Sequence, residues 1–228
     1  MYKTKYSKGG LYFFREGDER MISPWFDIPL RTNNVINMVC EVPMGTRIKY
    51  EVSIDDSYGH PIRRDKTREG LPRSYPSNIP WNYGMIPRTY EDPTRLHSIE
   101  DLKIPGDGDP LDVIDISRRK SGLGEVYGVK VFGALALIDG GELDWKLIAA
   151  RAADSETVLH EETLERIKKW FIDYKPGSGN TFAYNGSLMS HTNVIREASA
   201  AFKAHVASDN VYSLPCVVLL TRHRIYSS

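Results

Sequence analysis

The sequence predicts an α+β fold in which a small, highly curved β-barrel or sheet is followed by two helices. Short β-like segments separated by Gly, Pro, Asn and Asp fill the first two-thirds of the chain. Eight of the 13 prolines lie between about Tyr58 and Pro110, where they exclude long helices and favour extended, loop-rich structure. Two amphipathic segments close the chain, which places the helices after the strands.

The expected strands are short apolar and β-branched runs with turn residues on either side. They cover residues 11–15, 35–42, 47–54, 113–116, 125–138 and 146–150. Within the third of these, strand alternation sends Lys49 and Glu51 to one face and Tyr50 to the other. A Lys and a Glu on one strand face are most often a surface ion pair, so this pair alone does not indicate a site.

The two expected helices carry apolar stripes at helical spacing, which we interpret as core-packing faces. The first, residues 161–174, has acids in its first turn and ends before Pro176-Gly177; its stripe is Leu164, Ile167, Trp170 and Phe171. The second, residues 192–206, has the stripe Val194, Ile195, Ala198, Ala201, Phe202 and Val206. For the tail after this helix, three alternatives remain open: an edge strand, an oligomer contact or a disordered extension.

Length and composition favour one domain over the whole chain, 1–228, because 228 residues with 41% hydrophobic composition suffice for one substantial core. The formal net charge of +0 argues against nucleic acid or an anionic membrane as a partner. Cys40 and Cys216 form no C-x-x-C pattern, which argues against a zinc site or a disulfide framework and favours a reducing compartment. The apolar runs are too short to span a bilayer, and the N-terminus does not resemble a secretion signal.

The most informative motif is the acidic run Asp107-Gly108-Asp109-Pro110-Leu111-Asp112, which directly precedes an expected buried strand. Carboxylates this close repel one another unless a cation lies among them, and oxygen ligands favour Mg²⁺, Mn²⁺ or Ca²⁺. An EF-hand is excluded, because counting from Asp107 puts Leu111 at the fifth position and Asp112 where the turn glycine belongs. The alternative interpretation is a solvated acidic turn.

Further charged residues follow other expected elements. A second acidic patch, 139–146, also follows a strand-like run, and Tyr174-Lys175 ends the first helix. Carboxylates able to hold two or more divalent ions, together with Lys and Arg able to neutralise a polyanion, are typical of phosphoryl transfer to water. No P-loop, G-x-G-x-x-G or G-x-S-x-G motif is present, which disfavours nucleotide-driven, dinucleotide and serine-hydrolase chemistry.

Together these motifs resemble the soluble family I inorganic pyrophosphatases of the eukaryotic type. The run Asp107 to Asp112, followed by Val113, is similar to the family signature D-x-D-P-x-D-hydrophobic. Other blocks occur in the family order across about Trp25 to Val206: Phe26-Asp27-Ile28-Pro29-Leu30, Asn37 to Pro43, Asn82-Tyr83-Gly84, Glu91-Asp92-Pro93, Asp139 to Lys146 and Trp170 to Lys175. The resemblance leaves residues 1–24 as an N-terminal β extension and 207–228 as a C-terminal tail.

The resemblance implies a five-stranded, OB-like closed β-barrel with the two helices packed outside, and hydrolysis of pyrophosphate to two phosphates. It gives Asp109 the role of accepting a proton from the attacking, metal-bridging water. It implies that several Mg²⁺ ions bind per site, with Mn²⁺ or Zn²⁺ as substitutes and Ca²⁺ as an inhibitor. The implied metal ligands are Glu51, Asp107, Asp112, Asp139 and Asp144; the implied phosphate-binding residues are Lys49, Arg73, Lys146, Tyr174 and Lys175; the implied site-lining residues are Glu41, Asp65 and Tyr83.

The chain departs from the family pattern in two places. The loop 67–76 is shorter than expected, which leaves Arg68 and Arg73 as alternatives for the phosphate arginine, and Gly70-Leu71-Pro72-Arg73 favours the latter. Ile79 stands where the family often has a tyrosine, and Tyr75 is the candidate to replace it.

The resemblance also suggests a homodimer, and we expect a cytoplasmic location or, if the chain belongs to a longer parent, an organellar one. Two other functions remain alternatives: a two-metal phosphatase for short polyphosphate or phosphate esters, and a non-catalytic OB-like binding module.

Overall fold

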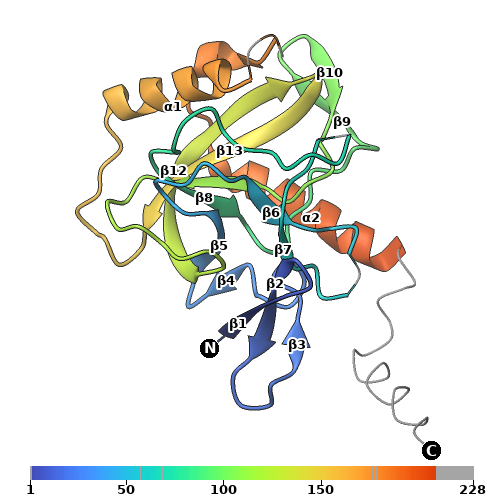
Figure 1. Ribbon diagram of the computed structural model, residues 1–228. Coiled ribbons are helices and arrows are strands. Elements are labelled where there is room, and N and C mark those ends of the chain that lie inside the picture. Colours follow the sequence, from blue (N-terminus) through green and yellow to red (C-terminus); the bar gives the residue numbers. More distant parts are fainter. Residues whose placement is uncertain (1, 57, 68, 176, 178, 209–228) are drawn as a thin grey trace, which may run out of the picture.

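The computed structural model describes residues 2–56, 58–67, 69–175, 177 and 179–208, and is built mostly of strands with two α-helices (Figure 1). The strands are β1 (Tyr2–Ser7), β2 (Gly10–Arg15), β3 (Met21–Ile22), β4 (Arg31–Thr32), β5 (Val35–Val42), β6 (Tyr50–Val52), β7 (Ile62–Arg64), β8 (Asn82–Met85), β9 (Leu96–Ile99), β10 (Leu102–Pro105), β11 (Asp112–Asp115), β12 (Val126–Asp139), β13 (Glu142–Arg151) and β14 (Thr181–Phe182). The helices are α1 (Glu161–Asp173), α2 (His191–Ser208) and the 3₁₀ turn η1 (Tyr184–Gly186).

A ring of five strands forms the centre of the molecule. Its order is β12-β13-β11-β8-β5, and a further pairing between β5 and β12 closes it. Most neighbours are antiparallel, but β11 runs parallel to β13 and pairs Asp112 with Lys146. The β12–β13 hairpin turns at Gly140-Gly141, where both residues have positive φ, so glycine suits both positions. The ring brings the start of β11, the β12–β13 turn and strand β8 to one edge.

Two glycines allow close packing within the ring and against it. A Cβ on Gly84 would lie 1.9 Å from the Val39 carbonyl oxygen, so β8 can approach β5 only without a side chain there. A Cβ on Gly133 would lie 2.3 Å from Leu188, and the β12–β13 register shifts between Val131 and Gly133. Before this bulge burial alternates along β12, and from Gly133 to Leu137 the strand is buried on both faces.

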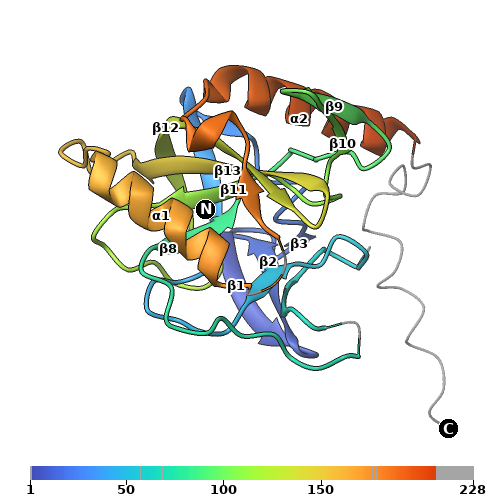
Figure 2. The same cartoon turned by 90° about the horizontal axis from the view of Figure 1, so that it is seen from above.

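The two helices pack against opposite faces of the β11–β13 pair (Figure 2). Val113 and Leu147 join the core cluster of α2, which includes Ile195. Ile114 and Ile148, the next residues along each strand, join the core cluster of α1, whose buried residues are Leu164, Ile167 and Phe171. None of the helices that the structure describes has both the length and the apolar character that crossing a bilayer requires.

A second sheet extends from the ring and contains the N-terminal strands, in the order β1-β2-β7-β6 with β3 paired to β2. Strands β1, β2 and β3 lie at the foot of the molecule in Figure 1, away from α1. Strand β6 carries Glu51 and lies beside β5, so this sheet supplies one wall of the site described below. A separate hairpin of β9 and β10 packs near β13.

The expected mostly-β fold with two late helices is confirmed, and both helices lie within two residues of the predicted ranges. The strand expected at 47–54 is shorter, Tyr50–Val52, because a turn begins at Ser53 and Ile48 contributes only an isolated bridge to Ser74. Within the described residues between 58 and 110 there is no helix, as the prolines indicated. The alternatives for the tail, and Arg68, lie outside the described residues.

Candidate active site

A cavity of about 410 Å³ opens at the ring edge where β11 begins and β12 turns into β13. Strand β6, the 107–112 loop, the β12–β13 hairpin and the end of α1 form its walls. Every residue predicted for the site except Asp65 lines it: Glu41, Lys49, Glu51, Arg73, Tyr83, Asp107, Asp109, Asp112, Asp139, Asp144, Lys146, Tyr174 and Lys175. Segments up to 134 residues apart, from Glu41 to Lys175, therefore meet in one cavity.

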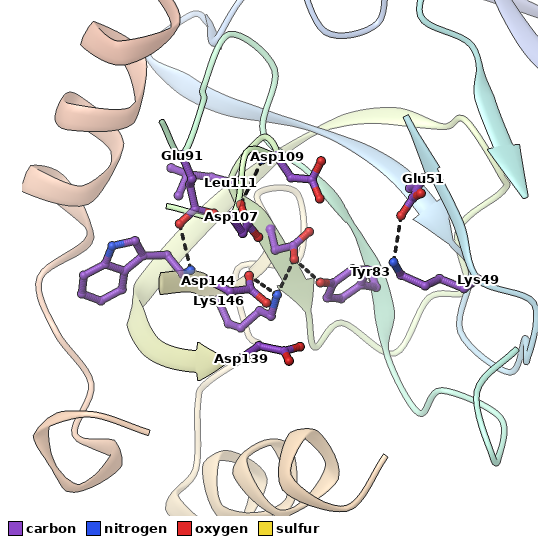
Figure 3. Close-up of polar contacts among 12 residues, drawn as sticks. Lys49, Glu51, Tyr83, Glu91, Asp107, Asp109, Leu111, Asp139, Asp144 and Lys146 are labelled. Carbon is purple, nitrogen blue, oxygen red and sulfur yellow. Dashed lines mark hydrogen bonds and ion pairs between the residues drawn. The ribbon is translucent and has the colours of Figure 1, made fainter. Parts of the chain in front are cut away.

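Strand pairing places a buried lysine between two aspartates. Asp144 and Lys146 alternate onto one face of β13, and the parallel register puts Asp112 of β11 beside them. The Lys146 ammonium donates to both carboxylates, and the Tyr83 hydroxyl also donates to Asp112 (Figure 3). Burial favours the neutral amine, but the charges of Asp112 and Asp144 hold the pKa of Lys146 well above its ordinary value. Lys146 is therefore a fixed positive charge.

The 107–112 loop is held by the backbone of a neighbouring segment. The Gly108 N–H donates to the Glu91 carbonyl at 2.9 Å, and the Glu91 N–H donates to the Asp109 carbonyl at 2.9 Å. Gly108 has φ 87°, a conformation that favours glycine. The Asp107 carboxylate accepts the Asp109 N–H at 2.9 Å, which fixes the angle between the two side chains.

The carboxylates of this loop repel one another. Burial, with the charges of Asp144 and Asp109, raises the pKa of Asp107 well above its usual range. Burial and the charge of Asp112 raise the pKa of Asp144 to about 6, against the opposite effect of Lys146. The Asp109 side chain is open to the cavity, yet partial desolvation there and the charges of Glu51 and Asp112 raise its pKa to about 7. Bound cations would relieve this repulsion.

Two cations, Lys49 and Arg73, also line this cavity, and both are paired with carboxylates. Lys49 donates to Glu51 at 2.8 Å and to Asp65 at 2.7 Å, and Arg73 pairs with the same Asp65 oxygen at 2.8 Å. Asp65 is buried outside the cavity lining and anchors both cations. Figure 3 shows Lys49 and Glu51 on one side of the site and Glu91 on the other, with Asp107, Asp109, Asp144 and Lys146 between them.

The end of helix α1 supplies the remaining positive charge. Lys175 pairs with Asp139 at 2.6 Å, and the Tyr174 hydroxyl donates to the same carboxylate at 3.4 Å. The Tyr174 ring stacks on Trp170 with a centroid distance of 5.0 Å and an interplanar angle of 5°, which fixes the tyrosine against the helix. The stack connects the position of the phenol to the core packing of α1.

Glu41 and Tyr75 line the cavity and also contribute to the packing around it. Glu41 is the extra residue of a bulge in β5, and its carboxylate accepts the Val52 N–H at 2.6 Å, which ties β5 to β6. Ile79 is fully buried in the core, whereas Tyr75 lines the cavity with its ring edge-on to Trp170. Tyr75 therefore lies at the cavity in the absence of a tyrosine at position 79.

Sequence reasoning missed Glu91 and Glu142 as candidate site residues. Glu142 follows the β12–β13 turn and lines the cavity. Glu91 accepts the Trp145 N–H at 3.0 Å, and one of its oxygens lies within 4.8 Å of ligand oxygens of Asp107 and Asp144. The only local signal was the Glu91-Asp92-Pro93 block, because the contact with Trp145 spans 54 positions and exists only in the folded chain.

These residues fit a site for divalent metal ions. The atoms that would bind the metal are all carboxylate oxygens, the ligand type that Mg²⁺ prefers. Among the residues that the structure describes, Glu91 Oε2 is buried without a hydrogen-bond partner, although it faces two further carboxylates. A buried polar atom of this kind needs a partner, and a cation would supply one.

Comparison with known sequences and structures gives one consistent result. The sequence model of the inorganic pyrophosphatase family matches residues 38–204. The chain is 39% identical over 207 residues to the chloroplastic soluble inorganic pyrophosphatase 1 of Chlamydomonas reinhardtii, covering 83% of this chain and 72% of that protein. It is 40% identical over 178 residues to the chloroplastic soluble inorganic pyrophosphatase 6 of Arabidopsis thaliana, covering 73% of this chain but only 58% of that protein.

The fold is similar to that of a solved structure. The type I inorganic pyrophosphatase of Toxoplasma gondii superposes with a TM-score of 0.80 at 33% identity, covering 90% of this chain and 99% of that one. The resemblance predicted from the acidic motifs is thereby confirmed. The chain belongs to the inorganic pyrophosphatase family.

Proposed function

We propose that this chain is a Mg²⁺-dependent inorganic diphosphatase that hydrolyses pyrophosphate to two phosphates. One observation supports the proposal above the others: carboxylates and cations line one cavity together, and each of these cations is paired with a carboxylate. Pyrophosphate with bound divalent ions presents the complementary charges, because its ions attract carboxylates and its oxygens attract Lys and Arg.

The residues proposed to hold metal are Glu51, Asp107, Asp112, Asp139 and Asp144. The bound ions would supply Lewis-acid chemistry, lowering the pKa of an attacking water and neutralising charge on the substrate oxygens. Mn²⁺ and Zn²⁺ are expected to substitute for Mg²⁺, while the looser coordination of Ca²⁺ is expected to inhibit. Lys146 occupies two of the carboxylates in the structure, so metal binding would have to share or displace its contacts.

Asp109 is our candidate for the general base. Its carboxylate opens into the cavity, and within the described part of the chain no protein donor is bonded to it. Asp112 differs, because it accepts from both Lys146 and Tyr83. A carboxylate free to accept a proton from water suits general-base chemistry.

The cations are proposed to bind the two phosphates. Lys49 and Arg73 share the Asp65 anchor, and we propose that Arg73 contacts phosphate with its planar fork. Lys146, Tyr174 and Lys175 would contact the second phosphate from the opposite side of the cavity. Such pre-positioned donors stabilise charge that develops during transfer.

The decisive experiment measures phosphate release from pyrophosphate with Mg²⁺ and with chelator, beside short polyphosphate and a panel of phosphate esters. We expect turnover of pyrophosphate only with metal, and its loss in Asp109→Asn. Full turnover in chelator, or faster turnover of an ester than of pyrophosphate, would reject the proposal and favour the broader phosphatase.

Several finer predictions belong to the same proposal. We take the closed ring of five strands to be the OB-like barrel of the family. A nucleic-acid role for such a barrel is disfavoured, because the cavity is rich in carboxylates and the chain has a formal net charge of +0. The homodimer and the cytoplasmic location remain predictions, to be tested by sedimentation and by imaging of the tagged protein.

A further inference from the structure

Glu91 is a buried acid that is not among the site residues implied by the resemblance. It lies in the segment between β8 and β9 and is 3% exposed. Its Oε1 accepts the Trp145 N–H at 3.0 Å. Among the residues that the structure describes, its Oε2 has no hydrogen-bond partner. Leaving a buried polar oxygen without a partner is costly, so this oxygen requires an explanation.

The unpartnered side of Glu91 faces two proposed metal ligands. One ligand oxygen each from Glu91, Asp107 and Asp144 lies within 4.8 Å of the others. Two oxygens on opposite sides of one Mg²⁺ or Ca²⁺ ion are about 4 to 5 Å apart, because each lies about 2.1 to 2.5 Å from the ion. The three carboxylates therefore have the spacing of groups that share a cation.

The position of Glu91 is fixed by the elements that carry the other two acids. Its backbone exchanges hydrogen bonds with Gly108 and Asp109, both at 2.9 Å. A Cβ on Gly106 would lie 2.4 Å from the Glu91 carbonyl oxygen, so the acidic loop packs directly on this residue. Its side chain is tied to β13 through Trp145, next to Asp144. Glu91 thus spans the loop and the strand.

We propose that Glu91 is a further ligand of the divalent-cation site, its Oε2 completing an inner three-carboxylate face with Asp107 and Asp144 (Figure 3). This inference rests on the proposed function, since it assigns an added ligand to the same site. The ligand class is a hard divalent cation, Mg²⁺ or Mn²⁺. A purely structural role would require only the acceptor for Trp145, which a glutamine also provides.

The test uses Glu91→Gln, which keeps the acceptor for Trp145 and removes the charge. The matched control is Asp92→Asn, one residue along, whose carboxylate accepts the Thr94 N–H at 2.8 Å instead of facing the cluster. Calorimetric titration of the metal-free full chain with Mn²⁺ should show at least a tenfold weaker site in Glu91→Gln and no change in Asp92→Asn. Wild-type affinity in Glu91→Gln would overturn the proposal.

Two further measurements keep the test decisive. Thermal unfolding in EDTA should leave Glu91→Gln as stable as wild type, because glutamine keeps the acceptor for the Trp145 N–H; a loss of stability would indicate a structural role instead. Diffraction from wild-type crystals soaked in Mn²⁺ should give an anomalous peak within about 2.5 Å of Glu91 Oε2. A Mn²⁺ peak bound to Asp107 and Asp144 without Glu91 overturns the inference, even if the variant does not fold.

Pyrophosphate hydrolysis by the wild-type chain is measured in parallel. If wild type turns over pyrophosphate while Glu91→Gln binds Mn²⁺ normally, only the inference about Glu91 fails. If wild type releases no phosphate with Mg²⁺, the proposed function fails whatever the titrations show.

Discussion

The two ends of strand β11 carry aspartates in opposite situations. Asp115 is fully buried, and its carboxylate accepts hydrogen bonds from Asn82 at 3.1 Å, Tyr127 at 2.8 Å and the Ser117 N–H at 3.0 Å. At the other end, Asp112 adjoins a group of acids that face one another, one of which has a buried oxygen without a described partner. Both aspartates lie on one strand of four residues, so the contrast comes from their immediate surroundings and not from different parts of the fold.

The difference lies in which donors the protein supplies. Around Asp115 they are neutral groups, and Asn82 is itself satisfied through Met44, Ser121 and Arg119. Tyr83, the next residue of β8, points to the opposite face of the sheet from Asn82, and its hydroxyl donates to Asp112. A buried carboxylate with a full set of protein donors is structural, whereas carboxylates left facing one another are available to a cation.

The largest expected effect is on the turnover rate and comes from the acidic loop that leads into β11 at Asp112. Asp109→Asn keeps the size of the side chain but removes the proton acceptor, so turnover of pyrophosphate should fall about 10²–10⁴-fold. Affinity for Mg²⁺ should change less. Asp112→Asn should instead weaken metal binding and recover part of its activity at high Mg²⁺. Turnover against Mg²⁺ concentration, with calorimetric titration, measures both; rescue of Asp109→Asn by metal would mean that the two roles are reversed.

At the Asp115 end of β11, the expected effect is on the stability of the folded protein. Asp115→Asn places an amide donor where the carboxylate accepted, leaving at least one buried donor without an acceptor at a cost of about 1–3 kcal/mol. Urea unfolding should show this loss, while turnover of the folded protein stays near wild type. An unchanged midpoint together with a large loss of turnover would remove the distinction between the two ends.

A smaller effect is expected across the cavity. Arg73→Lys should reduce turnover about tenfold or more, because a point charge cannot reproduce a bidentate contact worth roughly 1.5–3 kcal/mol. Arg64→Lys is the matched control, since Arg64 is exposed and donates only to Ser74 at 3.2 Å among the described contacts. Arg68→Lys should also be nearly silent. Equal, small effects at Arg73 and Arg68 would contradict the assignment of the phosphate arginine.

The smallest effect concerns pH and the metal-free protein. Asp109, with a pKa of about 7, and Asp144, with a pKa of about 6, hold protons that the unfolded chain releases near pH 4. Between about pH 4 and 7 the folded state thus binds more protons, and stability should fall as pH rises. Melting temperatures in EDTA should decrease from pH 5 to 8, and Mg²⁺ should flatten that slope. A rising or flat profile in EDTA would contradict the repulsion described at the acid end.

The sequence predicted the fold best where elements are long and periodic. The strand at 35–42 and both helices lie where apolar spacing placed them, because burial of one face dictates that spacing. Several strands of two to four residues, among them β3, β4 and β8, were not predicted individually, because so few positions show no period. Strand β11, also four residues long, was predicted from its apolar run. Strand β1 lies within the β extension expected at 1–24, but its own bounds were not predicted, because five of its six residues are exposed and give no apolar pattern.

The candidate site was likewise predicted best where its residues lie close together in the sequence. Asp107, Asp109 and Asp112 stand together in the sequence, so the local pattern was enough to identify an acidic site. Glu91 could not be found from composition or spacing, because an acid before Asp-Pro is typical of a turn and its partners come from another strand. The resemblance placed the distant lysines and tyrosines in the cavity, but only the fold shows which carboxylate each of them contacts.

Each cation proposed to bind phosphate in this cavity already has a carboxylate partner. Lys49 and Arg73 hold Asp65, Lys146 holds Asp112 and Asp144, and Lys175 pairs with Asp139. With the proposed roles, binding would therefore be an exchange of partners: metal ions would bind the carboxylates, and phosphate oxygens would bind the ammonium and guanidinium groups. Binding of metal alone, or of pyrophosphate alone, would break ion pairs and leave one member of each pair without a partner. Metal and pyrophosphate should consequently each tighten the binding of the other by the same factor, so that free pyrophosphate is a poor ligand and the metal complex a good one.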